Sequence, residues 1–165
     1  MRPNSQVFTA WPLLLFTLLV ASALALLPLS PWLTWCRPDW LLLMLCFWAL
    51  TLEGKFPLGL VFIVGCYHDL LLGSCFGMHA LAYLTAIHCV NTFYSRIGYY
   101  PLAQQTLMIT LFVGMSELIQ LWITAAKVGY PHHLLVWGTT VITLLIWPLF
   151  AGLFQDDMKR SKLAY

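Results

Sequence analysis

The chain has 165 residues, of which 61% are hydrophobic and 8% are charged, and its formal net charge is +2. Soluble domains have about a quarter of their residues charged, and a chain this short can bury only a modest core. The composition therefore excludes an ordinary soluble domain, and the small, scattered positive charge argues against nucleic-acid binding. With a mean hydropathy of +0.84, most of the chain is predicted to lie in a lipid bilayer.

Six apolar runs follow one another along the chain, separated by glycine, proline and charged residues. A helix crosses the hydrocarbon core with roughly 20 residues, and about 17 to 25 is the usual range. The sequence therefore predicts an all-α polytopic membrane protein, a bundle of about six transmembrane helices. A single transmembrane domain covers 1–154, and 155–165 form a short cytoplasmic tail whose structure is expected to fray. The predicted spans are approximately 8–27, 38–52, 57–72, 78–95, 100–126 and 134–154.

Two parts of this pattern admit another interpretation. The run 8–27 contains Ala23-Leu24-Ala25, which resembles a signal-peptide cleavage site, but its apolar stretch is longer than a signal peptide normally has. The runs 38–52 and 57–72 are short enough to form a re-entrant hairpin. A hairpin would bury Glu53 and Lys55 near mid-membrane, where a charge costs several kcal/mol, so two short spans are favoured.

The basic residues predict the orientation, because cytoplasmic loops are enriched in Lys and Arg. With six spans, both termini lie on one side of the membrane. That side holds Arg2, Lys55, Arg96, Lys159, Arg160 and Lys162. The other side holds only Arg37 and Lys127, so both termini are predicted to be cytoplasmic.

Several polar residues interrupt the apolar runs near their predicted outer ends. Counting about 1.5 Å per residue from those ends places them at a similar depth, in the outer half of the membrane. An intramembrane carboxylate is by default a functional hypothesis. The candidate polar pocket consists of His68, Asp69, His79, Glu117 and Gln120.

A structural role is the alternative for each of these residues. Asp69 could accept hydrogen bonds from Ser74 or from neighbouring backbone groups, and the histidines could be hydrogen-bonded core residues. Threonines at helical spacing give the runs 78–95, 100–126 and 134–154 polar faces, which could hydrogen-bond neighbouring helices. Gly65, Asp69 and Gly73, each four apart, predict a small-residue face suited to close helix packing.

Two short segments are predicted to shape the ends of helices. Pro38 suits a first helical turn, and Asp39 complements the helix dipole there. Arg37 is expected to reach lipid headgroups, with Trp40 anchored at the outer interface. The stretch from Gly73 to Gly77 predicts a tight outer turn, in which Gly73 adopts a left-handed helix cap.

No catalytic residue, metal site or cofactor site is predicted. The five cysteines lack C-x-x-C spacing, which argues against a disulfide framework or a zinc site. An intramembrane aspartyl hydrolase would need two carboxylates that share one site. Only one aspartate lies inside a predicted span, so the partner of Asp69 would have to be Glu117.

Two stretches resemble the bacterial rod shape-determining protein MreD family. The first is Arg37-Pro38-Asp39-Trp40-Leu41-Leu42-Leu43 with Phe47-Trp48-Ala49-Leu50. The second runs from Gly59 to Gly65 and continues through Asp69-Leu70-Leu71-Leu72-Gly73-Ser74 to Phe76-Gly77-Met78. Length, span number and Trp147-Pro148 also agree, so the resemblance covers nearly the whole chain. The positions that match family-typical residues are Arg37, Pro38, Asp39, Asp69, Gly73, Ser74 and Gly77.

The resemblance implies a component of the cell-wall elongation machinery in the bacterial inner membrane. It implies as partners the bitopic protein MreC, the actin-like MreB, RodA and its class B transpeptidase, together with membrane lipids. It also implies a likeness to the substrate-binding subunits of vitamin transporters. The leading hypothesis is therefore a non-enzymatic scaffold for lateral peptidoglycan synthesis. The alternative is a small-molecule-binding transporter subunit with an outward-facing polar pocket.

Overall fold

A computed structural model describes residues 5–28, 37–53, 55–97, 100–128 and 137–163, and side chains are described within 11–152 of these ranges. The described residues form α-helices and contain no strand, which confirms the all-α prediction. The helices are α1 (Ser5–Leu26), α3 (Trp40–Thr51), α4 (Leu58–Leu72), α5 (Met78–Ile97), α6 (Leu102–Val128) and α7 (Gly138–Leu163).

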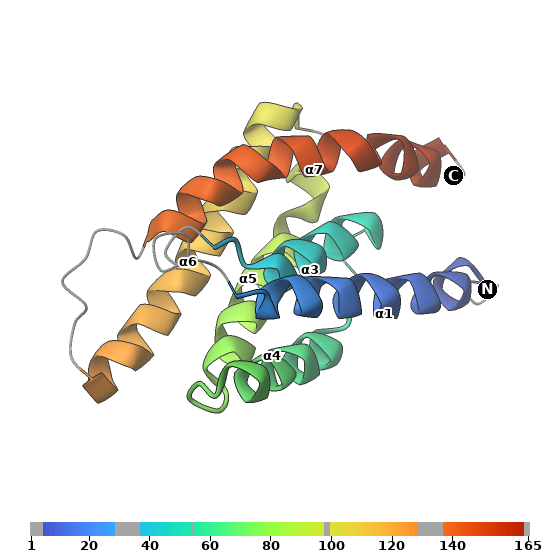
Figure 1. The fold of residues 1–165 in the computed structure, drawn as a ribbon. Coiled ribbons are helices and arrows are strands. Elements are labelled where there is room, and N and C mark those ends of the chain that lie inside the picture. Colours follow the sequence, from blue (N-terminus) through green and yellow to red (C-terminus); the bar gives the residue numbers. More distant parts are fainter. Residues whose placement is uncertain (1–4, 29–36, 54, 98–99, 129–136, 164–165) are drawn as a thin grey trace.

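The short helix α3 lies at the centre of the molecule (Figure 1). It is apolar all round, and nine of its 12 residues are buried, as expected for a helix enclosed by other helices. It packs against α1, α5 and α7, while α4, α5 and α6 each pack against the next helix in the chain. The indole Nε1 of Trp48 also donates a hydrogen bond of 3.0 Å to the Thr17 hydroxyl, which joins α3 to α1.

The start of α3 is set by Asp39. Its Oδ1 accepts a 3.1 Å hydrogen bond from the Leu42 N–H, which makes Asp39 the N-cap residue and Trp40 the first helical residue. Pro38 therefore lies one residue before the cap, whereas the sequence interpretation placed it in the first turn. Its carbonyl accepts a hydrogen bond from the Trp40 N–H at 3.0 Å.

The end of α4 is set by Gly73, which has φ 63° and ψ 28°. Its N–H and that of Ser74 both donate to the Asp69 carbonyl, which closes the helix with a left-handed residue. The predicted left-handed cap is confirmed. The turn then reaches Gly77, which also has a positive φ of 90°.

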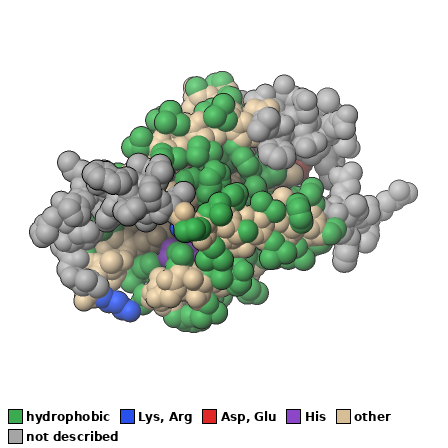
Figure 2. All heavy atoms as spheres, viewed as in Figure 1, with side chains coloured by type: hydrophobic (Ala, Val, Ile, Leu, Met, Phe, Trp, Pro, Cys, Tyr) green, Lys and Arg blue, Asp and Glu red, His purple; other side chains and the backbone are tan. Residues whose placement is uncertain are grey.

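The outer surface of the bundle is apolar. Figure 2 shows hydrophobic side chains over most of the described surface on the visible face. Exposed leucine, isoleucine, valine and aromatic side chains occur on α1, α4, α6 and α7, and the most exposed include Ile63, Leu70, Trp122, Leu145 and Leu149. Such a surface is typical of a protein surrounded by lipid rather than water.

By length and composition, one described helix could cross a membrane, the α6 segment Leu102–Lys127. Four further apolar helical segments are shorter: Trp11–Leu26, Trp40–Thr51, Leu58–Leu72 and Gly138–Gly152. The helices coincide closely with the predicted apolar runs, except that α7 continues through Leu163 into the segment expected to fray. Arg2, residues 29–36 and 129–136, and the side chains of Lys159, Arg160 and Lys162 lie outside the described residues.

Candidate functional site

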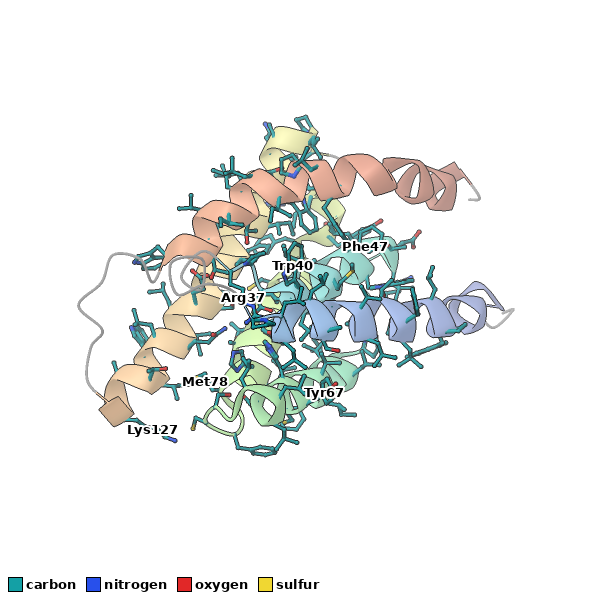
Figure 3. All side chains as sticks on the ribbon, viewed as in Figure 1. Arg37, Trp40, Phe47, Tyr67, Met78 and Lys127 are labelled. Atoms are coloured by element: carbon teal, nitrogen blue, oxygen red, sulfur yellow. The ribbon has the colours of Figure 1, made fainter. Side chains whose placement is uncertain are left out.

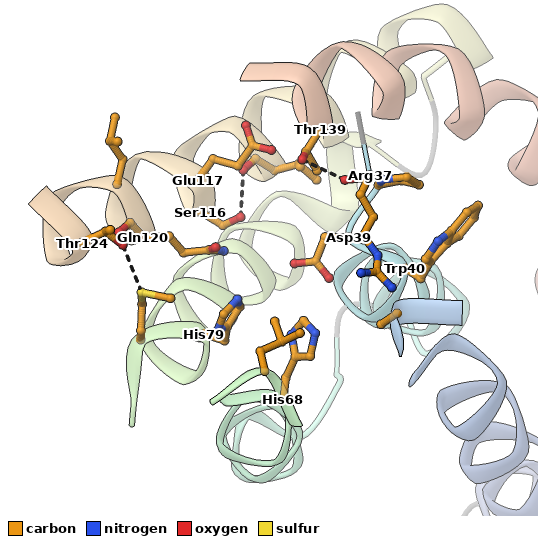
Figure 4. Close-up of a pocket in the computed structure, with 16 residues that line it drawn as sticks. Arg37, Asp39, Trp40, His68, His79, Ser116, Glu117, Gln120, Thr124 and Thr139 are labelled. Atoms are coloured by element: carbon orange, nitrogen blue, oxygen red, sulfur yellow. Dashed lines mark hydrogen bonds between the residues drawn. The ribbon is translucent and has the colours of Figure 1, made fainter. Parts of the chain in front are cut away.

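A cavity of about 480 Å³ lies among the ends of the helices. It lies where α1 and α4 end and where α3, α5 and α7 begin, and α6 supplies a wall from its second half. Figure 4 shows the polar side chains that reach it from α4, α5, α6, α7 and the start of α3, and Figure 2 shows a hollow in which histidine is visible. The polar lining residues are Arg37, Asp39, His68, His79, Ser116, Glu117, Gln120, Thr124 and Thr139.

Arg37 connects three segments at the edge of this cavity. Its Nη2 donates a 3.0 Å hydrogen bond to the Leu24 carbonyl in the last turn of α1, where a cation complements the helix dipole. Its own carbonyl accepts a 2.9 Å hydrogen bond from the Thr139 hydroxyl at the start of α7. The described guanidinium contact is therefore with a helix end, whereas the sequence interpretation directed Arg37 to lipid headgroups.

A chain of hydrogen bonds joins α3, α5 and α4 at the inner wall. The buried Tyr83 hydroxyl is 2.7 Å from both carboxylate oxygens of Asp39 and 2.6 Å from Nδ1 of His68. The His68 and Tyr83 rings are stacked, with centroids 5.8 Å apart. Asp39 therefore caps α3 and also joins it to α5, which is more than the helix-dipole role expected for it.

Asp69 organises the turn between α4 and α5 and does not line the cavity. Its Oδ1 accepts hydrogen bonds from the Ser74 hydroxyl at 2.7 Å and from the His79 N–H at 3.1 Å, and it contacts His79 Nδ1 at 2.7 Å. Its Oδ2 accepts a bond from the Gly77 N–H at 2.7 Å. The carboxylate is 1% exposed, so all its acceptor capacity serves this turn. The hydrogen bonds that the structural alternative expected for Asp69, from Ser74 and from neighbouring backbone groups, are present.

Glu117 lies at the contact of α6 and α7. Its Oε2 accepts a hydrogen bond from the Thr140 hydroxyl, and its Oε1 is buried without a partner among the described residues. The hydroxyls of Thr110 and Thr143 and the indole N–H of Trp147 are buried and unpartnered in the same way. All four groups belong to α6 or α7, so the polar character of this pair of helices extends beyond the cavity.

The predicted pocket is thus brought together only in part. His68, His79, Glu117 and Gln120 line one cavity, whereas Asp69 lies behind His79. Arg37 and Asp39, which were assigned to the membrane interface and a helix end, also line it. Sequence reasoning assigned Thr139 to a threonine face rather than to the pocket, and it missed Tyr83 and Ser116; a tyrosine at helical spacing from His79 was the one signal that could have found Tyr83.

The threonine faces contribute less between helices than expected. Thr85, Thr92, Thr106 and Thr124 each donate to the carbonyl four residues earlier in their own helix. Thr139 and Thr140 are the threonines of these faces whose hydroxyls bond to another segment among the described contacts, apart from a 3.6 Å contact from Thr124 to the Met78 sulfur. An apolar environment favours this local pairing because each hydroxyl finds an acceptor without a second helix.

The arrangement does not match the hydrolase constellation. Asp69 is enclosed by the α4–α5 turn while Glu117 bonds α7, so these two carboxylates do not share a site. Among the described residues, no group of three or more His, Cys, Asp and Glu side chains is arranged to hold a metal ion. The cavity is instead a mixed polar and apolar space of the size that accommodates small molecules.

Comparisons with known proteins identify the family. The family described as rod shape-determining protein MreD matches residues 5–156. A rod shape-determining protein MreD from Haemophilus influenzae is 30% identical over 153 residues, covering 90% of this chain and 94% of that protein. No solved structure matches the chain, so the expected likeness to vitamin-transporter subunits is without support from that comparison. Because both matches extend over nearly the whole chain, it belongs to the MreD family of rod shape-determining proteins.

Proposed function

We propose that this protein is a six-span component of the bacterial inner membrane with both termini in the cytoplasm. The apolar outer surface supports the membrane location, because lipid-exposed side chains need no polar cover. The start of α1 and the end of α7 point to the same side of the molecule, as an even number of crossings requires (Figure 1).

The distribution of basic residues supports the orientation. Arg37 and Lys127 lie toward the end of the molecule away from the start of α1 and the end of α7 (Figure 3). The sequence carries six basic residues on the termini side of the predicted spans and two on the other side. This asymmetry favours a cytoplasmic location for the termini.

Within this framework the protein acts as a non-enzymatic scaffold for lateral wall synthesis. Membership of a rod shape-determining family carries this proposal. The partner is a bitopic MreC-type protein, and through it the chain contributes to an assembly with MreB, RodA and a class B transpeptidase. Since the described chain is nearly all helix and short loops, recognition occurs within the membrane or at helix ends.

The outward face of α4 is the proposed contact for the partner's single transmembrane helix. α4 packs extensively on α5 alone, and Ile63, Tyr67 and Leu70 are exposed on the side of the helix opposite Gly65, the residue that meets Ala80 of α5. Ile63 and Leu70, seven residues apart, are 68% and 70% exposed and lie on one side of the helix. Within a membrane, two helices associate through close packing of their side chains, so a bulkier side chain on this face of α4 should disrupt contact with the partner helix.

The test is co-purification with an MreC-type partner in mild detergent. The wild-type chain should form a stable complex, and the Ile63→Trp, Leu70→Trp double variant should lose most of it. The matched control is Leu145→Trp, Leu149→Trp on α7, whose side chains are 65% and 71% exposed. If folded, monodisperse wild-type protein forms no complex, the scaffold proposal is wrong; if both double variants bind equally, the contact lies elsewhere.

A small-molecule-binding transporter subunit is the second candidate. The cavity of about 480 Å³ with polar groups among apolar walls is the observation that favours it. On that account, replacing Glu117 should weaken ligand binding, whereas replacing Asp69 should act through the fold of the α4–α5 turn.

A further inference from the structure

The two cavity histidines have a defined proton arrangement. His79 Nδ1 lies 2.7 Å from Asp69 Oδ1, and a carboxylate can only accept, so this nitrogen carries a hydrogen. The Tyr83 hydroxyl has one hydrogen, which is donated to Asp39. His68 Nδ1, 2.6 Å from the same hydroxyl oxygen, must then be the donor. In the neutral form, both rings therefore keep Nε2 as an acceptor.

These Nε2 atoms are accessible from the cavity. Both histidines line the cavity, and each residue is only 5% or 6% exposed. No described hydrogen bond engages either Nε2 atom. Neither atom is among the fully buried unpartnered nitrogens and oxygens, so both are accessible. The ring centroids lie 4.6 Å apart, and each ring is held in place by a hydrogen bond at its Nδ1.

The charges around the cavity favour a cationic occupant. The Asp39 carboxylate lines it with one cation, Arg37, and the Asp69 carboxylate stands directly behind His79. The described contact of the Arg37 guanidinium is with the Leu24 carbonyl. An anionic group would meet excess negative charge in a space of low dielectric, whereas a cation would be stabilised there.

From this geometry we propose that the cavity binds a primary ammonium group through Nε2 of His68 and Nε2 of His79. A primary ammonium has three N–H donors and a positive charge, which match the two acceptors and the acidic surroundings. The apolar part of the lining, which includes Trp40, Leu72 and Met78, accommodates the carbon chain that bears the amine. The ammonium can come from an ethanolamine lipid headgroup or from a soluble amine.

The first test needs no mutation. Purified, delipidated protein is titrated with dihexanoyl phosphatidylethanolamine, and separately with the phosphatidylcholine and phosphatidylglycerol of the same chains, and binding is followed by calorimetry. Phosphatidylethanolamine should bind at least about tenfold more tightly than phosphatidylcholine, which has the same charge but no N–H donor. Equal affinities for these two lipids, or tightest binding of phosphatidylglycerol, would overturn the proposal.

A second titration with free ethanolamine distinguishes the sources. Binding as tight as that of the lipid indicates a soluble amine, and binding of the lipid alone indicates a headgroup; both support the ammonium site. If neither phosphatidylethanolamine nor ethanolamine binds, the ammonium-site proposal is overturned. The readout requires no partner protein, so its failure is distinct from failure of the scaffold proposal.

Matched variants then locate the site. His79→Asn and His68→Asn retain an N–H donor near the position of Nδ1 and remove Nε2. Each should weaken phosphatidylethanolamine binding about tenfold and leave phosphatidylcholine binding unchanged. His88→Asn, an exposed histidine on the same helix as His79, is the control and should bind like wild type. Wild-type affinity in both cavity variants, with the fold intact, would refute the assignment.

Discussion

Asp69 shows how a charged residue can be retained inside an apolar helix. Its two oxygens accept from a hydroxyl and two backbone N–H groups and contact one imidazole, all within the next ten residues. A buried polar group is costly only when it lacks partners. The same carboxylate orients His79, so the turn that Asp69 stabilises also determines which ring nitrogen faces the cavity.

Gly73 is predicted to be intolerant of a side chain for conformational reasons alone. A Cβ at Gly73 would meet nothing within 4 Å, but its φ is +63°. Gly73→Ala should therefore reduce the free energy of unfolding by about 1 to 2 kcal/mol, the cost of a left-handed residue. Gly59 also has open space but is helical, so Gly59→Ala should be neutral or slightly stabilising. Thermal unfolding in detergent measures both, and equal effects would contradict the explanation.

Two threonines one turn apart on α7 should respond to valine with opposite signs. The Thr140 hydroxyl donates to Glu117, so Thr140→Val should destabilise the protein by about 2 kcal/mol. The Thr143 hydroxyl is buried without a described partner, so Thr143→Val should stabilise it by about 1 kcal/mol. Denaturant unfolding of the two variants in the same detergent tests this, and destabilisation by Thr143→Val would show that its hydroxyl has a partner.

The sequence predicted only those residues of the candidate site that are polar and interrupt an apolar run. His68, His79, Glu117 and Gln120 stand out because they are polar in apolar runs, and all four line the cavity. Asp69 is equally conspicuous in the sequence, yet its hydrogen bonds direct its side chain toward the α4–α5 turn and not into the cavity. Tyr83 does not stand out, because an aromatic ring in an apolar run is normally core or interface. The direction of a side chain depends on neighbouring helices, and no local spacing encodes it.

At the scale of the elements, the α4–α5 pair depends on close backbone approach. A Cβ on Gly65 would lie 2.3 Å from the Ala80 Cα and 2.6 Å from its nitrogen, and these backbone atoms cannot move aside cheaply. The predicted small-residue face is thus confirmed at Gly65, while Gly73 serves the turn instead. Small residues allow helices to approach in this way where lipid provides no hydrophobic driving force.

Gly65→Ala is therefore predicted to separate α4 from α5. The substitution should destabilise the protein by about 3 kcal/mol, as overpacking of a core does. Gly152→Ala on α7, where a Cβ meets nothing within 4 Å, should have little effect. Thermal unfolding compares the two variants, and a tolerated Gly65→Ala would mean that the two helices are not in close backbone contact.

Helix positions were more predictable than helix ends. Apolar runs located every described helix because burial in lipid demands a continuous apolar segment. The start of α3 depended on the N-cap bond of Asp39, and α7 continued beyond the apolar run through a polar segment. Capping and helix propagation act over a few residues and are independent of hydropathy, so hydropathy cannot locate the ends.

At the scale of the whole molecule, the cavity exists because α6 and α7 diverge from α4 and α5 at one end of the bundle (Figure 1). The packing order around α3 produces this shape. Six apolar runs are compatible with many such orders, and periodicity within one run carries no information about its neighbours. For that reason the sequence predicted a bundle and its polar residues but not the arrangement of the cavity walls.

The arrangement predicts which ends of the molecule face each side of the membrane. Cys75 lies in the turn between α4 and α5, and Lys55 lies in the connection between α3 and α4. One helix separates them, so a membrane-spanning α4 must place them on opposite sides.

In a chain with the other four cysteines replaced by alanine, a membrane-impermeant maleimide should label Cys75 from outside the inner membrane. With Cys75→Ala and Lys55→Cys, labelling should require disruption of that membrane. Labelling of both from outside would mean that α4 does not cross the bilayer, and the reverse pattern would mean that the termini are external.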